Sequence, residues 1–153
     1  MIEIFALEPH EVERADAVLP FSRLDQGDGF YLVAWDEGEP VGHAHLALTN
    51  PPELQDVFVL PERRRQGIAG ELTRAAEREA AARGHDRLAL TVSAADRGAQ
   101  RLYADLGYVD AGVPPTRVRG TITIRGEPLE VDDTLLHREK RLDPVDFGLR
   151  RSS

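Results

Sequence analysis

The sequence contains no cysteine. Disulfides, a cysteine nucleophile and metal sites built from thiolates are therefore excluded. No stretch reaches the roughly 20 apolar residues that a membrane-spanning helix needs. The first residues, MIEIFALEPHE, also lack the basic segment and the apolar run of a secretory signal. Together these absences predict a soluble, cytoplasmic protein that does not bind a membrane.

Basic residues are fewer than acidic ones. Lys and Arg total 19 against 27 Asp and Glu, and the formal net charge is −8. An acidic chain is poorly suited to general binding of nucleic acid or anionic membranes, so neither is expected as a partner. The length of 153 residues fits one domain, which we expect over residues 1–142, followed by a loose tail over 143–153.

Apolar periodicity predicts a mixed α+β fold. Strand-like patterns precede and follow a helical segment at 67–83, and this order implies two parallel strands joined by a right-handed crossover. Two further helices are predicted, one opened by Pro9 and one over 97–106, while 20–29 is interpreted as a loop or a broken helix. The predicted strands cover residues 1–7, 30–35, 41–48, 53–60, 87–93, 118–124 and 129–137.

Three consecutive arginines stand at the start of the helix predicted over 67–83. Arg63, Arg64 and Arg65 lie where the aligned peptide dipoles of a helix already carry partial positive charge, which makes basic side chains unfavourable. A bound anion reverses this, because unpaired N–H groups, guanidinium groups and a glycine that allows close approach together form a phosphate site. The segment therefore predicts a site for one small polyanion. The G-x-x-x-x-G-K-[ST] and G-x-G-x-x-G phosphate motifs are both absent.

Two motifs resemble the GCN5-related N-acetyltransferase (GNAT) superfamily. The first is [RQ]-x-x-G-x-[GA] after a strand that ends in valine, present here as Arg64-Arg65-Gln66-Gly67-Ile68-Ala69 after Val59. The second is present as Asp96, Ala99, Leu102-Tyr103 and Gly107-Tyr108, and the matching core covers about residues 53–109. The family often has Asn at the position of Asp96, so a donor contact and a helix N-cap are both open for this side chain.

The resemblance implies the acyl-CoA N-acyltransferase fold, with a splayed mixed sheet of six or seven strands and about four helices, and it implies acetyl-CoA as the acyl donor. The pyrophosphate would lie on the N–H groups of 65–69. The pantetheine arm would pair with the backbone of Phe58 and Val59, in a gap beside 90–93. The implied donor-binding residues are Phe58, Val59, Arg64, Arg65, Gln66, Gly67, Ile68, Ala69, Asp96 and Ala99.

Acetyl transfer needs an acid for the leaving thiolate, and the resemblance implies Tyr103 in this role. A phenol with an ordinary pKa of about 10 can protonate a thiolate of similar basicity. The alternative for Tyr103 is a helix tyrosine packed against the core. For the base, Glu53 stands six residues before Val59, where some family members carry a catalytic glutamate. A solvated loop end and proton transfer through water are the alternatives, and Asp56 is expected on the opposite face of the strand.

His43 and His45 lie on one face of the strand predicted over 41–48. This spacing is compatible with a metal site, yet no third ligand is evident and no metal is expected. A role in the substrate pocket and half-buried strand histidines are the other interpretations.

The sequence therefore predicts an acetyl-CoA-dependent N-acetyltransferase that acetylates a primary amine by direct transfer in a ternary complex. A backbone N–H near Phe58 or Val59 is expected to stabilise the oxyanion. The net charge of −8 favours a cationic amine acceptor, and a homodimer is compatible with the resemblance. Two alternatives stay open: a non-catalytic acyl-CoA sensor, and an acyl group other than acetyl.

Overall fold

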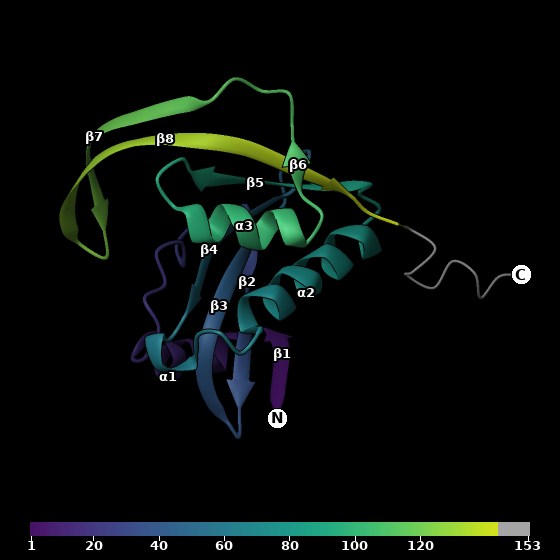
Figure 1. Cartoon of the computed structure of the whole chain (residues 1–153). Helices are drawn as coiled ribbons and strands as arrows, with labels where there is room; N and C mark the ends of the chain where they lie inside the picture. The colour runs from purple at the N-terminus through teal and green to yellow at the C-terminus, as the bar shows by residue number, and fades with distance from the viewer. Residues whose placement is uncertain (144–153) are drawn as a thin grey trace, which may run out of the picture.

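A curved mixed sheet organises the protein (Figure 1). The structure is a computed structural model that describes residues 1–143, and these residues form eight strands in the order β1-β2-β3-β4-β5-β8-β6, with β7 paired to β8. β4 and β5 run parallel. The strands are β1 (Ile2–Ala6), β2 (Gly29–Asp36), β3 (Glu39–Ala47), β4 (Glu53–Val59), β5 (Arg87–Ser93), β6 (Val109–Asp110), β7 (Thr116–Ile124) and β8 (Glu127–Arg141).

Three α-helices and two short 3-10 helices accompany the sheet within the described residues. Proline opens both 3-10 helices, because its fixed φ suits the first helical position. The helices are η1 (Pro9–Glu11), α1 (Val12–Asp16), η2 (Pro61–Arg63), α2 (Ile68–Ala82) and α3 (Arg97–Asp105).

The predicted mixed α+β class and the parallel strand pair are confirmed. The described residues contain more strands than the six or seven expected, because Val109 and Asp110 pair with β8 as the strand β6. A strand of two residues is too short to produce a periodic pattern. They contain three α-helices where the resemblance implied about four, and the segment 20–28 forms turns and bends, in agreement with the loop interpretation of 20–29.

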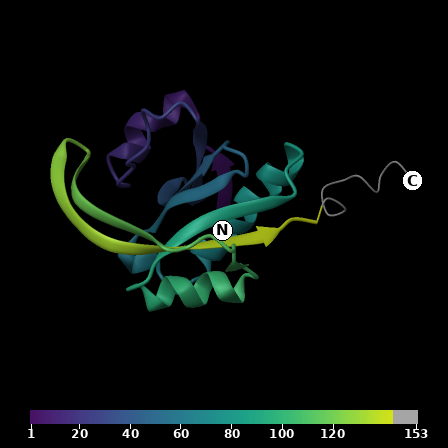
Figure 2. The ribbon, with the colours of Figure 1, turned by 90° about the horizontal axis from the view of Figure 1, so that it is seen from above.

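Alternation along the strands divides the core between the two faces of the sheet. On β2, Leu32 and Ala34 pack in the cluster that α2 and α3 cover, while Tyr31, Val33 and Trp35 pack in the cluster beneath α1. Successive strand residues point to opposite faces, so one strand serves both clusters. Seen from above, α1 and α3 lie on opposite sides of the sheet (Figure 2).

The parallel strands β4 and β5 separate soon after they pair. Their register contains only Glu53 opposite Ala89 and Leu54 opposite Leu90 within the described residues. After Leu54, the described residues of β4 pair only with β3 and no longer with β5. The predicted splay in the sheet is therefore present, and it leaves backbone groups of β4 facing an opening.

A β-bulge interrupts β4 next to this splay. His43 and His45 of β3 oppose Phe58 and Gln55, so two residues of β4 stand opposite one residue of β3. Asp56, within the bulge, has a φ of 49°. The bulge breaks the alternation that placed Asp56 on the face opposite Glu53. That expectation is wrong. The Asp56 carboxylate accepts from the Tyr31 hydroxyl, and Glu53 is linked through Gln55 to His45, which packs against the same Tyr31 ring, so both acids lie on one face of β4.

The hairpin of β7 and β8 curves away from the sheet and reaches the side on which α1 lies (Figure 2). Arg125, in its turn, donates to the Asp16 carboxylate at 2.5 Å and to the Phe21 carbonyl at 2.9 Å. A segment near the C-terminal end of the chain thus contacts the loop that follows α1.

Most of the tail expected over 143–153 lies outside the described residues, so the domain limits stay a prediction. Within residues 1–143, the helices are all too short or too polar to cross a membrane.

Candidate active site

The turn between η2 and α2 presents unpaired backbone N–H groups. Arg65 and Gly67 have φ values of 66° and 82°. Within the described residues, the first N–H of α2 that forms a backbone hydrogen bond is that of Glu71, which donates to the Gly67 carbonyl at 3.0 Å. The preceding N–H groups at the start of an α-helix have no carbonyl within the helix to bind. Residues 65–70, here called the phosphate cradle, therefore offer several donors at the positive end of the α2 dipole.

The three arginines beside the cradle have different partners. Arg64 donates through Nε to the Val59 carbonyl at 3.0 Å, which ties the turn to the end of β4. Arg63 is partly exposed and pairs with Asp36 of β2 at 2.6 Å. Arg65 is exposed and has no ion-pair partner among residues 1–143, and the nearby Glu71 pairs with Arg74.

A cleft of about 550 Å³ leads from the cradle along the end of β4 to α3. We call it the donor cleft. Of the residues that the resemblance implied for donor binding, all except Gln66 line this cleft. The lining consists of Val57, Phe58, Val59, Arg63, Arg64, Arg65, Gly67, Ile68, Ala69, Gly70, Asp96, Gly98, Ala99, Leu102 and Tyr103.

A smaller hollow of about 260 Å³ lies between the separated strands β4 and β5. We call it the side hollow. Glu53, Gln55 and Asp56 line it from β4, and Ser93 lines it from β5. Four residues line both openings, so the hollow adjoins the inner end of the donor cleft. These residues are Val57, Asp96, Ala99 and Tyr103.

Tyr103 lies at the junction of the two openings and is 8% exposed. Its ring packs edge-on against Tyr108, with centroids 5.9 Å apart. Burial raises the pKa of Tyr103 to about 12, against a smaller opposing contribution from the Thr73 hydroxyl. The phenol therefore stays protonated at neutral pH, and burial makes it a weaker acid than the phenol of ordinary pKa on which the acid role was argued. Tyr103 packs in the core, as the alternative interpretation predicted, and it also lines the cleft, while its role as the acid stays a prediction.

Glu53 lines the side hollow and is held by a chain of side chains. The Gln55 amide donates to the Glu53 carboxylate at 2.7 Å, and the Gln55 carbonyl oxygen lies 3.1 Å from Nδ1 of His45. His45 is buried, and burial lowers its pKa although the Gln55 hydrogen bond opposes the shift. The structure thus places Glu53 and Tyr103 around one hollow, which sequence spacing alone could not establish.

Asp96 caps α3, as one of its two interpretations predicted. Its carboxylate accepts a hydrogen bond from the Ala99 N–H at 2.9 Å. The capped turn also forms the wall of the donor cleft opposite β4, where Asp96 and Ala99 both line it. The cap therefore fixes the shape of this wall.

The histidines of β3 belong to the cluster beneath α1. His43 stacks on Phe21 with centroids 4.6 Å apart, and Tyr31 packs edge-on against both His43 and His45. Their interpretation as half-buried is wrong, since both are fully buried. His43 Nδ1 lies 2.8 Å from the backbone carbonyl of Asp56.

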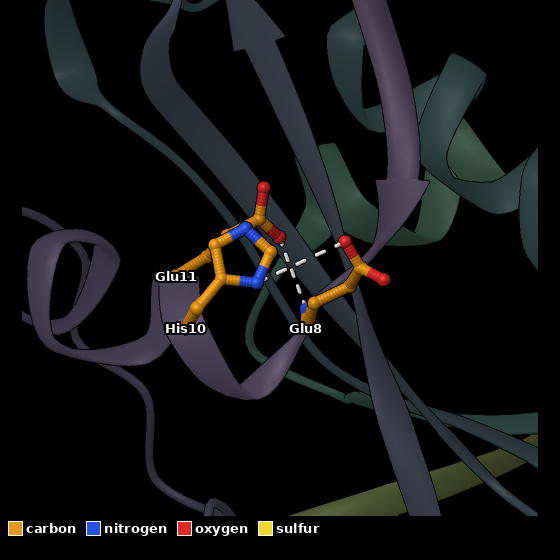
Figure 3. A group of neighbouring side chains, drawn as sticks. All are labelled: Glu8, His10 and Glu11. Atoms are coloured by element: carbon orange, nitrogen blue, oxygen red, sulfur yellow. Dashed lines mark hydrogen bonds and ion pairs between the residues drawn. The ribbon is translucent and has the colours of Figure 1, made fainter.

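One group of potential metal ligands occurs within residues 1–143, and it is remote from these histidines. Glu8, His10 and Glu11 have ligand atoms within 4.8 Å of one another (Figure 3). The Glu11 carboxylate accepts from the Glu8 N–H at 3.0 Å, an interaction that closes the start of η1. The capping of this short helix accounts for the arrangement without a metal ion.

The bulge and its contacts were missed from the sequence. Asp56 receives a hydrogen bond from the Tyr31 hydroxyl at 2.5 Å, although 25 residues separate them. A weak signal was present, because aspartate is unfavourable inside a strand, and the segment ELQDVFV places one there. Nothing in the local pattern identified its partner.

Comparison with known proteins identifies relatives of this chain. The model of the Acetyltransferase (GNAT) family matches residues 1–108. The Uncharacterized N-acetyltransferase YhfO of Bacillus subtilis (strain 168) is 31% identical over 111 residues, which cover 68% of this chain and 74% of the relative. The resemblance inferred from the two motifs is thereby confirmed.

Solved structures share the fold at low sequence identity. A Bacillus subtilis acetyltransferase in complex with CoA has a TM-score of 0.72 at 16% identity, covering 94% of this chain and 100% of that one. A GNAT family acetyltransferase from Elizabethkingia anophelis with acetyl-CoA bound has a TM-score of 0.67 at 18% identity, covering 92% and 98%. The chain is therefore a member of the acetyltransferase (GNAT) family.

Proposed function

We propose that this acetyltransferase uses acetyl-CoA to acetylate a primary amine by direct transfer in a ternary complex. The observation that carries the proposal is the phosphate cradle, whose unpaired N–H groups open into a cleft that ends at Tyr103. An anionic diphosphate fits the start of α2 by charge and by hydrogen bonding. The CoA and acetyl-CoA bound in the two similar structures support this donor class.

Each lining residue has a role in donor binding under this proposal. The N–H groups of Arg65–Ala69 bind the diphosphate, while the side chain of Arg64 braces the turn against Val59. The arm of the donor lies along Phe58 and Val59, where β4 has no partner strand on the side of β5. Gln66 contributes its backbone as part of the cradle. Asp96 and Ala99 form the opposite wall.

The chemistry requires one bond to form and one to break. A neutral amine attacks the thioester carbonyl carbon, and a C–N bond forms while the carbonyl oxygen becomes an oxyanion. A backbone N–H near Phe58 or Val59 stabilises this oxyanion. The C–S bond then breaks, and Tyr103 protonates the leaving thiolate. The amine gives up its proton to Glu53, directly or through water.

The acceptor side favours a cationic amine. Acidic Glu53 and Asp56 line the side hollow together with one basic residue, Arg23, and the chain has a net charge of −8. Such a field attracts cations and disfavours polyanions. A cytoplasmic location and a homodimer remain predictions of the sequence.

Calorimetry with CoA and acetyl-CoA, followed by an amine screen, tests the proposal. We expect both ligands to bind, and we expect free thiol to be released with at least one cationic primary amine. Lys140 is the single lysine of the sequence, so self-acetylation of side-chain amines is confined to one position in the mass spectrum. Absence of binding heat with either ligand would contradict the proposal.

The alternative is an acyl-CoA sensor without catalysis. It shares the cradle but does not need an acid at the end of the cleft. The hydroxyl-bearing side chain of Tyr103, which lines both the donor cleft and the side hollow, favours the enzyme. Binding of acetyl-CoA without turnover over a broad amine panel would favour the sensor instead.

A further inference from the structure

The bulge of β4 depends on a residue in an unfavourable backbone conformation. Asp56 has a φ of 49°, in the left-handed region that residues with a side chain rarely adopt. Asp enters this region more readily than most residues, yet such conformations persist only where the surroundings enforce them. The contacts around Asp56 are therefore expected to determine whether the bulge forms.

Two strands and a loop form hydrogen bonds with the side-chain carboxylate and the backbone carbonyl of Asp56. The Tyr31 hydroxyl of β2 donates to the Asp56 carboxylate at 2.5 Å, and the backbone N–H of Ser22 donates to the same oxygen at 3.2 Å. Nδ1 of His43, on β3, lies 2.8 Å from the backbone carbonyl of Asp56. Because a carbonyl only accepts hydrogen bonds, Nδ1 of His43 carries the proton.

The supporting side chains are themselves immobilised. His43 is 0% exposed, stacks on Phe21 and lies with its ring centroid 5.7 Å from that of Phe58. Its Nε2 atom has no hydrogen-bond partner within the described residues. The Tyr31 hydroxyl accepts from the N–H of Arg23 at 3.0 Å. The support thus consists of buried groups with little freedom to move.

The bulge determines where the following backbone points. Immediately after Asp56, Val57, Phe58 and Val59 line the donor cleft, and β4 has already separated from β5 at Leu54. A bulge bends its strand and increases the local twist. Without it, the regular register would carry these three residues along a different path.

We propose that Tyr31 and His43 are positioning residues for acyl transfer: they hold Asp56 in the bulge and so direct the backbone of Val57–Val59 toward the acyl group. This inference rests on the function proposed above. Neither of the two side chains is among the described residues that line the donor cleft or the side hollow. They act through Asp56.

Tyr31→Phe tests the proposal because it removes one donor and keeps the ring. We expect kcat to fall on the order of tenfold, as small displacements of reacting groups have effects of this size or larger. The KM for acetyl-CoA is expected to change less than kcat, because the phosphate cradle, which binds the diphosphate, is separate from the bulge. Hydrogen exchange at the amides of Val57–Val59 should accelerate by about tenfold.

Thr121→Val is the control. Its hydroxyl also donates to a carboxylate, that of Glu130, within the β7–β8 hairpin. Neither Thr121 nor Glu130 is among the described residues that line the donor cleft or the side hollow. This variant is expected to leave kcat and exchange at Val57–Val59 unchanged. Both variants are assayed well below their Tm, so that a general loss of stability affects them alike.

A second pair of variants tests His43 and serves if Tyr31→Phe does not fold. The amide nitrogen of Asn takes nearly the position of Nδ1 in histidine, so His43→Asn keeps a donor for the Asp56 carbonyl. His43→Leu removes it. We expect His43→Asn to retain at least about ten times the kcat of His43→Leu.

The outcomes separate this proposal from the one it rests on. If Tyr31→Phe changes kcat and local exchange no more than Thr121→Val does, and His43→Asn equals His43→Leu, the positioning role is wrong. If the wild-type protein does not bind acetyl-CoA, the proposed function fails. Exchange at Val57–Val59 then still decides whether Tyr31 and His43 hold the bulge.

Discussion

Tyr103 combines a packing role with a position at the end of the donor cleft. A buried phenol is costly to ionise, and burial accordingly raises the pKa of Tyr103 to about 12. The same burial that makes Tyr103 part of the core therefore keeps its phenol protonated well into the alkaline range. Its neighbours Tyr108 and Thr73 hold the ring from the core side.

Tyr103→Phe is expected to lower kcat by about a hundredfold, the usual contribution of a general acid. The ring still fills its site, so Tm and the Kd for CoA should be preserved. Steady-state kinetics with the best amine of the screen, together with calorimetry, provide the measurement. An unchanged kcat would remove Tyr103 from the mechanism and leave it with its packing role.

Helix α2 is flanked at each end by a glycine with positive φ, and its N-terminal end also lies at the donor cleft. Gly67 precedes it with a φ of 82°, and Gly84 follows it with a φ of 91°. A Cβ at either position would meet no heavy atom within 4 Å, so the need for glycine is conformational in both cases. The two glycines differ in one respect, since Gly67 lines the donor cleft.

Gly67→Ala and Gly84→Ala form a matched pair. Each is expected to reduce the free energy of unfolding by about 1 kcal/mol, because alanine is unfavourable at positive φ. Only Gly67→Ala should weaken CoA binding, by about tenfold, since relaxation of its backbone turns N–H groups of the cradle away from the diphosphate. Calorimetry with CoA compares them. Equal affinities would show that the cradle does not bind CoA.

The β7–β8 hairpin is attached to the loop after α1 through Arg125. The Asp16 carboxylate beside it raises the pKa of the Arg125 guanidinium, and both side chains are partly exposed. An exposed ion pair contributes little to global stability. Its effect is instead local, because it joins two segments that enclose a hollow lined by Phe21, Arg125 and Gly126.

Arg125→Ala should therefore free the hairpin turn without unfolding the protein. We expect hydrogen exchange over 120–129 to accelerate by about tenfold and Tm to change little. Arg117→Ala on the same hairpin, which loses a pair with Asp132 made within the hairpin, is the control and should leave the turn as it is. Exchange that is unaffected by Arg125→Ala would mean that strand pairing alone holds the hairpin.

Buried ionisable groups reduce the stability of the folded protein at both low and high pH. Burial raises the pKa of Tyr31, Tyr103 and Tyr108 above the ordinary 10, and it lowers the pKa of His43 and His45 below 6.5. Above pH 10 the unfolded chain loses phenol protons that the folded state keeps, so stability falls. Below pH 6.5 the unfolded chain binds imidazole protons that the folded state excludes, so stability falls again.

Tm should accordingly be highest between about pH 6.5 and pH 10 and decline on both sides. Scanning calorimetry across pH measures this directly. Tyr108→Phe should make the alkaline decline shallower, because it removes one of the three tyrosines that couple folding to protonation. Phenolate absorbance that develops fully near pH 10 in folded protein would contradict the expectation.

Several parts of the architecture were predictable because their causes are local. The parallel pair follows from strand–helix–strand order, and Asp96 caps α3 because its side chain lies beside the free N–H of Ala99. The helix predicted after Pro9 is present as η1 and α1. The strand β6 was not predictable, since two residues carry too little periodicity. The pairing of Arg63 with Asp36 also escaped, because 27 residues separate them.

The sequence by itself determined the phosphate cradle and the family, because the glycine, the arginines and the helix start act on one another within a few residues. Only the tertiary structure decided how β4 is shaped and which acids share a hollow. The bulge at Asp56 depends on Tyr31 and His43, which belong to other strands. Contacts of this kind have no local pattern, since they exist only after distant segments have packed together.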